Sequence, residues 1–259
     1  MKPNPIAKVL STLSCHEVKH LLMGGQACVL YGAAEFSRDV DIVIPPDDQN
    51  LDRFRLALAE LEAQPIAVPP FEADYLKRGH AVHFRCAHPD AMGMRLDVMS
   101  ALRGVDEFSI LWERRIEIED DLGSVIPVIG IEDLVKAKKT QREKDWPMIR
   151  RLVETHYSQH LESPTPEQIT FWLRESRTSE MLYRLGRQFP EEAKNNIEQR
   201  QFLWRVVCFE ELPYIDKELE DEQMKEMYAD RRYWNVLKAE LEQLRNQRLD
   251  QLRKPPAGD

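Results

Sequence analysis

The sequence predicts an α+β fold, in which a mixed β-sheet flanked by helices precedes an all-helical C-terminal region. Up to about residue 160, short apolar segments bounded by glycine or proline alternate with amphipathic segments. Beyond that point the spacing of apolar residues is helical. The segment Ser163-Pro164-Thr165-Pro166 is typical of a linker between the two parts. Two domains are therefore expected, residues 1–160 and 161–259.

The first domain is expected to begin with a helix and then to alternate strands and helices. The strand that enters Gly24-Gly25 stops there, and a later strand is closed by Pro45-Pro46. Between residues 50 and 63, apolar residues recur at helical spacing. The expected strands are 18–23, 40–44, 80–86, 95–99, 115–119 and 124–129, and the expected helices are 6–14, 26–31, 50–63 and 132–154.

The second domain is expected to contain helices alone. Thr165 can cap the first of them, with Pro166 in its first turn and Gln168 completing a capping box. Phe171 and Trp172 are expected in its core. The charged segment 216–253 predicts a long helix whose exposed face is either solvated or part of an oligomer contact.

Composition limits the classes of function. The 259 residues carry a formal net charge of −9, which argues against broad binding of long nucleic acids. The 4 cysteines form no CxxC pair, as is typical of reduced thiols in a cytosolic protein. The N-terminus lacks the apolar core of a signal peptide, and no apolar run reaches the roughly 20 residues of a membrane span. We therefore expect a cytoplasmic protein.

Three aspartates are the candidate catalytic and metal-binding residues. Asp39 and Asp41 lie one residue apart on an expected strand, so their side chains share one face. Asp97 lies in the middle of another expected strand, where an unpaired carboxylate is costly. A lone Asp-x-Asp is often a solvated turn. Together with the third carboxylate, however, this pair predicts a site for Mg²⁺ or Mn²⁺, because these ions prefer oxygen ligands.

A glycine pair precedes these aspartates by one helix length. Gly24 and Gly25 predict a tight backbone loop at the start of a helix, where free N–H groups can hold a phosphate. Ser37 and Arg38 come directly before the first aspartate. Ser37 is either a turn cap or a nucleotide ligand, and Arg38 is either a solvated charge or a phosphate ligand. The site is therefore expected to take a nucleoside triphosphate such as ATP.

The stretch GGQACVLYG…SRDVDIVI resembles the nucleotidyltransferase superfamily related to polymerase β. It looks like the bacterial minimal-nucleotidyltransferase branch, which includes abortive-infection toxins. The likeness continues through LWERR and IEDLVKAKKTQREKD and covers about residues 6–155. It implies the nucleotidyltransferase fold and the release of pyrophosphate from an NTP. Relatives often carry arginine where this chain has Glu35, and an acidic residue there would repel a triphosphate.

The expected helix 132–154 adds charged candidates. At 100° per residue, Lys138, Arg142 and Asp145 fall on its apolar face and therefore need partners. The resemblance implies that a lysine and an aspartate of this helix serve the active site. A bound triphosphate is one partner for Lys138 and Arg142. The alternative is an ion pair between Arg142 and Asp145 that only holds the helix in place.

Two functions follow from these observations. The first is a metal-dependent nucleotidyltransferase whose acceptor hydroxyl belongs to RNA, a protein or a small molecule. Such an enzyme either acts alone or is the toxin of a toxin–antitoxin pair. A toxin would have a cognate antitoxin as its partner. The second is a non-catalytic module that binds a nucleotide, and the acidic Glu35 favours this function.

A loose cluster of histidine and cysteine is formed by His80, His83, Cys86 and His88. The cluster is either a metal site or a set of strand residues near the active site, with His83 beside Asp97.

Overall fold

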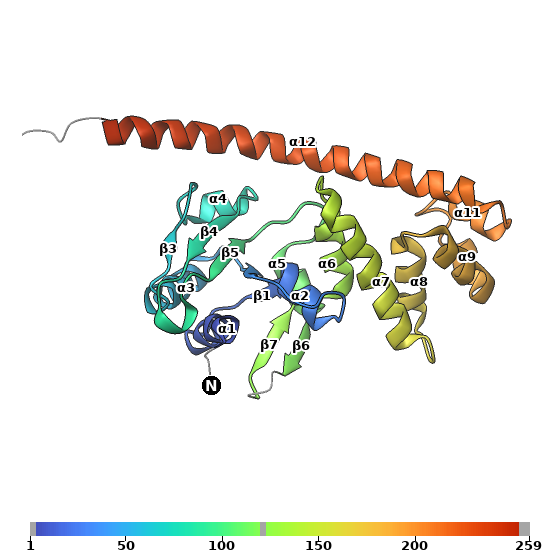
Figure 1. The fold of residues 1–259 in the computed structure, drawn as a ribbon, viewed down its shortest axis with the longest axis horizontal. Helices are drawn as coiled ribbons and strands as arrows, with labels where there is room; N and C mark the ends of the chain where they lie inside the picture. The colour runs from blue at the N-terminus through green and yellow to red at the C-terminus, as the bar shows by residue number, and fades with distance from the viewer. Residues whose placement is uncertain (1–3, 120–122, 254–259) are drawn as a thin grey trace, which may run out of the picture. The chain divides into compact units, whose positions relative to one another are not determined.

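The computed structural model describes residues 4–119 and 123–253, and within them the chain forms two compact units (Figure 1). The first unit draws its described residues from Met1–Ala27, Phe36–Gly130 and Arg232–Asp259, and the second from Cys28–Glu35 and Ile131–Arg231. The main division falls at Gly130, whereas the sequence predicted a boundary at residue 160. The reason is that the residues after Gly130 pack with the following helices of the second unit.

The first unit contains a seven-stranded mixed sheet, which confirms the expected α+β class. The strand order is β3-β4-β5-β2-β1-β7-β6. The pairs β2–β5 and β1–β7 are parallel, and the other neighbours are antiparallel. The strands are β1 Leu21–Met23, β2 Asp39–Val43, β3 Gln64–Pro65, β4 Val82–Arg85, β5 Arg95–Met99, β6 Ile116–Glu119 and β7 Val125–Val128.

The central strands separate an apolar face from a polar face. Val40 and Ile42 on β2, like Leu96 and Val98 on β5, are fully buried, while the residues between them are partly exposed. The helix α3 (Asp48–Glu60) covers the apolar face, because Phe54 contacts Phe84 of β4 edge-on at 6.0 Å between ring centroids. Burial of the apolar face therefore fixes which way the aspartates of β2 and β5 point.

Short helices complete the first unit. Asn4 caps α1 (Pro5–Cys15) and Asp47 caps α3, each accepting hydrogen bonds from N–H groups of the first turn. The α1 helix packs against α3 and β2. The helix α2 (Gly24–Leu30) begins in the first unit and ends in the second. The other helices are α4 (Ala73–Lys77), η1 (Pro89–Ala91) and α5 (Phe108–Glu113).

The second unit is helical in its described residues from Ile131 onward. The capping box of Thr165 and Gln168 is confirmed at the start of α8. Trp172 is fully buried, and its ring contacts Tyr157 edge-on at 5.0 Å. The helices are α6 (Ile131–Lys138), η2 (Glu143–Asp145), α7 (Trp146–His160), α8 (Pro166–Glu175), α9 (Ser179–Gln188), α10 (Pro190–Asn195), α11 (Leu203–Val207) and α12 (Leu212–Arg253).

The single helix expected over residues 132–154 is wrong, because the chain breaks it between α6 and α7. Pro147 lies in the first turn of α7, where a missing N–H costs nothing, whereas inside a continuous helix it would remove a hydrogen bond. The turn is fixed by local polar contacts. The Trp146 indole donates to the Thr140 carbonyl at 3.0 Å, and the Thr140 hydroxyl donates to Asp145 at 2.5 Å.

The 42-residue helix α12, which Figure 1 draws as one unbroken helix, belongs to the second unit up to Arg231 and to the first from Arg232. Within the second unit, the Asp230 carboxylate accepts from the Gln141 N–H at 2.8 Å. Within the first, Glu240 accepts from Arg78 and is bonded to the buried His80 at 2.7 Å. Among the described residues, no helix combines the length and apolar character needed to cross a membrane.

Candidate active site

The candidate site lies on the polar face of β2 and β5. Because these strands are parallel and in register, Asp41 is the direct neighbour of Asp97, and Asp39 is the neighbour of Arg95. Neighbouring strands are about 4.8 Å apart, and alternate residues share a face. The structure therefore brings together the three aspartates that the sequence singled out. Three carboxylates this close repel one another unless a cation lies among them.

Arg95 supplies a positive charge on that face. Its Nε donates to Oδ1 of Asp97 at 2.8 Å. Nδ1 of His83, on β4, lies 2.9 Å from the same oxygen and 3.2 Å from Nη2 of Arg95. When Nδ1 of His83 carries a proton, it can donate to Asp97 but cannot accept from Arg95. When Nδ1 is unprotonated, it can accept from Arg95 but cannot donate to Asp97, so each tautomer makes only one of the two contacts. The expected position of His83 beside Asp97 is confirmed.

These contacts keep Asp97 ionised. Burial alone would raise the pKa of Asp97, but the hydrogen bonds from His83 and Arg95 and their charges outweigh it and lower the pKa. The hydrogen bond to Asp97 also raises the pKa of Arg95, and the charges of Asp97, Asp39 and Asp41 add to this effect. Because its pKa is lowered, Asp97 is a weak proton acceptor and a better ligand or hydrogen-bond acceptor.

The glycine pair packs directly against this cluster. Gly24 has φ +67°, and a Cβ at that position would lie 1.9 Å from Oδ2 of Asp41. A Cβ on Gly25 would lie 2.3 Å from the Ser37 hydroxyl oxygen. Instead of forming a loop before the helix, the two glycines are the first residues of α2. The Gly25 N–H points to Oδ2 of Asp41 at 3.4 Å, so glycine at both positions keeps the backbone close to the site.

The segment before Asp39 is tied to α2. The Gln26 side-chain amide donates to the Ser37 carbonyl at 3.0 Å, and the Ser37 hydroxyl donates to the Asp39 carbonyl at 3.4 Å. Arg38 is exposed, with its guanidinium carbon 5.9 Å from the centroid of the Phe36 ring. Ser37 therefore has a structural contact at the site, whereas a phosphate contact by Arg38 stays a prediction.

The carboxylates are the right type of ligand for Mg²⁺ or Mn²⁺, but their arrangement does not fit a bound ion. Throughout residues 4–119 and 123–253, no three histidine, cysteine, aspartate or glutamate side chains converge so that they could hold a metal. At this face, Oδ1 of Asp97 accepts a hydrogen bond from the Arg95 guanidinium instead. The predicted three-carboxylate metal site is therefore not formed in this conformation.

The basic candidates Lys138 and Arg142 belong to the second unit. Lys138 is the last residue of α6, and Arg142 lies in the turn that follows, so the predicted shared helical face is wrong. Nε of Arg142 donates to Oδ2 of the buried Asp145 at 2.8 Å. The ion pair that the sequence offered as an alternative is thus present. A phosphate contact by Lys138 stays a prediction.

Arg95 and Gln26 are not among the site residues that the sequence predicts. Strand alternation could have found Arg95, since it lies two residues before Asp97 and therefore shares its face. Its pairing partner depends on the register between strands, which the sequence does not state. Gln26 gave no signal, because its amide acts on the backbone of a residue eleven positions along the chain.

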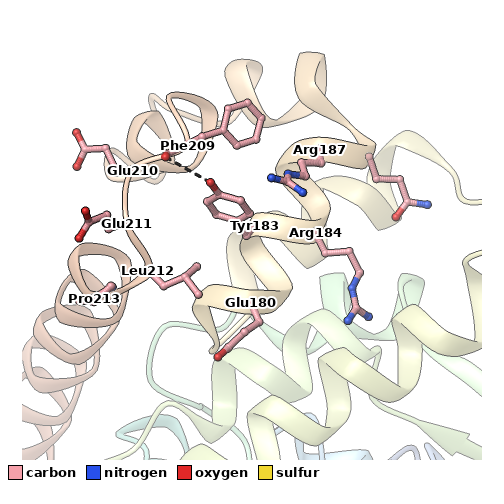
Figure 2. A pocket seen from close by; sticks show the side chains of 10 residues that line it. Glu180, Tyr183, Arg184, Arg187, Phe209, Glu210, Glu211, Leu212 and Pro213 are labelled. Atoms are coloured by element: carbon pink, nitrogen blue, oxygen red, sulfur yellow. Dashed lines mark hydrogen bonds between the residues drawn. The ribbon is translucent and has the colours of Figure 1, made fainter.

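A cavity of about 960 Å³ lies in the second unit, and none of the predicted site residues lines it. Tyr183 and Phe209 lie edge to face on its wall, and the Tyr183 hydroxyl donates to the Phe209 carbonyl at 3.3 Å (Figure 2). The guanidinium carbon of Arg187 lies 5.0 Å from the centroid of the Tyr183 ring and 5.6 Å from that of the Phe209 ring. The lining also includes Arg184 and three glutamates, so its charges do not specify one class of ligand.

No protein-family model matches the chain, and no curated protein matches it in sequence. Among solved structures, the solution structure of the antibiotic-resistance factor ANT(2'')-Ia is similar, with a TM-score of 0.35 and 12% identity. The match covers 76% of this chain and 95% of that chain. A TM-score this low does not establish a shared fold, so function has to be inferred from the geometry of β2 and β5.

Proposed function

We propose that the polar face of β2 and β5 is the active site of a nucleotidyltransferase, which moves a nucleoside monophosphate from an NTP to an acceptor hydroxyl. The observation that carries this proposal is the register that sets Asp41 beside Asp97, with Asp39 on the same face. The close approach of Gly24 to Asp41 supports it. The sequence resemblance of the same stretch to the nucleotidyltransferase superfamily points the same way.

In the proposed reaction, the acceptor oxygen attacks the α-phosphorus of the NTP. The bond from that phosphorus to the bridging oxygen of pyrophosphate breaks, pyrophosphate leaves, and the hydroxyl proton passes to solvent. Asp97 accepts a hydrogen bond from the acceptor hydroxyl and orients it; its lowered pKa favours this role over proton removal. Asp39 and Asp41 are the residues that would hold Mg²⁺ or Mn²⁺, and such an ion would neutralise phosphate charge.

The test is label transfer by the full chain in the presence of Mg²⁺ or Mn²⁺. Each labelled NTP is offered in turn with a small-RNA pool, the protein itself and a panel of small hydroxyl compounds. Asp41→Asn keeps the side-chain volume but removes the charge, and Asp52→Asn, on the exposed side of α3, is the matched control. We expect Asp41→Asn to reduce transfer at least 100-fold and Asp52→Asn to leave it unchanged. Transfer that survives Asp41→Asn would contradict the proposal.

A second candidate function is a nucleotide-binding module that transfers nothing. The observation that favours it is the hydrogen bond from Arg95 to Asp97, because it occupies a carboxylate oxygen that could otherwise bind an ion. The acidic Glu35 favours it as well. This alternative predicts NTP binding without transfer to any acceptor. A toxin role would be one setting for the enzyme, and it predicts that expression slows growth for the wild type but not for Asp41→Asn.

A further inference from the structure

The cavity of about 960 Å³ in the second unit has a wall of two aromatic rings, Tyr183 and Phe209 (Figure 2). We propose that this cavity binds a purine nucleoside monophosphate, whose base packs against the two rings and whose phosphate is held by Arg184 and Arg187. The site is separate from the proposed nucleotidyltransferase site, because every residue that lines it belongs to the second unit. Its ligand would therefore bind even to a chain that transfers nothing.

Phe209 occupies a backbone position that favours glycine. The helix α11 ends in a Schellman motif, in which the Glu210 N–H donates to the Arg205 carbonyl at 3.0 Å and the Phe209 N–H donates to the Val206 carbonyl at 3.2 Å. The residue at this point of the motif takes a left-handed conformation, and Phe209 has φ +56°. A bulky side chain is unfavourable there because it crowds the backbone. Phe209 is also 48% exposed, so burial of its ring does not offset this cost.

The helices α1 and α3 end in the same conformation, but with charged residues. Glu17 follows α1 at φ +52°, and Glu62 follows α3 at φ +49°. Both side chains are exposed, so their carboxylates are hydrated. An exposed phenylalanine ring gains no such hydration. Because the fold gains little from a ring at residue 209, its presence in this conformation indicates a contact with a ligand.

Two interactions hold the aromatic wall in place. The ring centroids of Tyr183 and Phe209 lie 5.4 Å apart in an edge-to-face arrangement, and the Tyr183 hydroxyl donates to the Phe209 carbonyl at 3.3 Å. Rings that are already fixed lose little freedom when a planar ligand binds. Nucleotide bases stack on aromatic side chains in this way, and a purine offers a larger face than a pyrimidine. The cavity volume also falls within the roughly 300–1,000 Å³ that is usual for small ligands.

The charges that line the cavity differ in whether they already have partners. Within the part of the chain that the structure describes, neither Arg184 nor Arg187 pairs with a carboxylate. Glu210, by contrast, pairs with an arginine of α11 at 2.6 Å, and Figure 2 shows Glu211 pointing away from the two rings. Glu180 is then left to balance two guanidinium groups. The side of the cavity near the rings therefore has an excess of positive charge and suits an anionic ligand.

A single nucleotide fits these charges better than an RNA strand does. The planar donors of a guanidinium match the oxygens of phosphate in pairs, so two arginines can hold one phosphate group. The further phosphates of a strand would meet the carboxylates of Glu180, Glu210 and Glu211 on the lining. The net charge of −9 also opposes binding of a long polyanion.

The first experiment is isothermal titration calorimetry of the full chain with AMP. Adenosine and ribose phosphate are matched ligands, because the first lacks the phosphate and the second lacks the base. We expect each of them to bind roughly tenfold more weakly than AMP. Equal affinities for AMP and adenosine would overturn the phosphate contact. A short single-stranded RNA should bind no more tightly than AMP, and tighter binding of the RNA would overturn the assignment to a single nucleotide.

Photo-crosslinking shows where AMP binds. An azido analogue of AMP is bound to the full chain and activated by light, and mass spectrometry then identifies the labelled peptides. We expect the label on α9 or on residues 208–213, and an excess of AMP should prevent it. Label confined to peptides of the first unit would overturn the proposal.

Phe209→Gly removes the ring at a position where glycine is favoured. Its matched control is Glu62→Gly, which makes the same backbone change in the first unit. We expect Phe209→Gly to weaken AMP binding about tenfold and Glu62→Gly to leave it unchanged. The unfolding midpoint of Phe209→Gly should stay within about 2 °C of the wild type, because relief of the backbone strain offsets the lost ring contact. Equal AMP affinities for the two glycine variants would overturn the proposal.

Arg187→Met gives a second measurement if Phe209→Gly folds poorly. Arg151→Met is its control, because Arg151 is an exposed arginine of α7 in the same unit and does not line the cavity. We expect Arg187→Met to weaken AMP binding about tenfold while the affinity for adenosine stays the same. A purely structural arginine would change both affinities alike. An unchanged ratio of AMP to adenosine affinity in Arg187→Met would therefore overturn the phosphate contact.

Discussion

The close contact between Gly24 and Asp41 gives the sharpest test of the site geometry. Gly24→Ala would place a Cβ 1.9 Å from Oδ2, 2.5 Å from Cγ and 2.6 Å from Cβ of Asp41. The backbone there has φ +67°, which costs an alanine roughly 1–2 kcal/mol. Moving the Asp41 side chain off its position adds about 1–3 kcal/mol, as in other overpacked sites. We therefore expect a total loss of about 2–5 kcal/mol.

Gly93→Ala separates these two contributions. Gly93 has φ +76°. Apart from Gly93 itself and the residues on either side of it, no described residue has a heavy atom within 4 Å of a Cβ built at this position. This variant therefore carries the backbone cost alone, roughly 1–2 kcal/mol. The difference between the two alanine variants measures how tightly the Asp41 side chain is held against α2.

The assay is thermal unfolding of the full chain, followed by calorimetry. A loss of 1 kcal/mol lowers the midpoint by about 2–4 °C in a protein of this size. Gly93→Ala should lower it by about 2–8 °C, and Gly24→Ala by several degrees more. Gly24→Ala should also abolish label transfer, while Gly93→Ala leaves it intact. If the two midpoints coincide, the contact between Gly24 and Asp41 is not as described.

Two further predictions concern the second unit. Burial, and to a smaller extent the charge of His160, lower the pKa of His156 from 6.5 to about 4. Neutral His156 therefore contributes stability that is fully present above pH 6.5 and is lost as the pH falls toward 4. His156→Gln, which still offers an oxygen to the Trp172 indole N–H, should flatten the pH dependence of the unfolding midpoint in this window; an unchanged slope would contradict the assignment. Lys138→Ala should weaken NTP binding measured by calorimetry about tenfold, and Lys144→Ala should not. Equal NTP affinities for the two variants would contradict a phosphate contact by Lys138.

The sheet could largely be predicted from the sequence, because its signals are local. The strand β5 was predicted at residues 95–99 because apolar and polar residues alternate there and the neighbouring segment contains Gly93. Alternation also put Asp39 and Asp41 on one face. The apolar spacing hides the break after α6, because it continues across the break, and Pro147 is the one local signal that a new helix begins there.

The charge balance of the site could not be predicted from the sequence, because it depends on how distant strands pair. Alternation places Arg95 and Asp97 on one face, but only the pairing of β2 with β5 shows that Asp39 and Asp41 belong there too. Three carboxylates on one sheet face are unfavourable in the free protein, and a residue that neutralises them also competes with their ligand. Arg95 therefore offsets part of this charge through its hydrogen bond to Asp97, and only the register of β2 with β5 shows which carboxylates it lies beside.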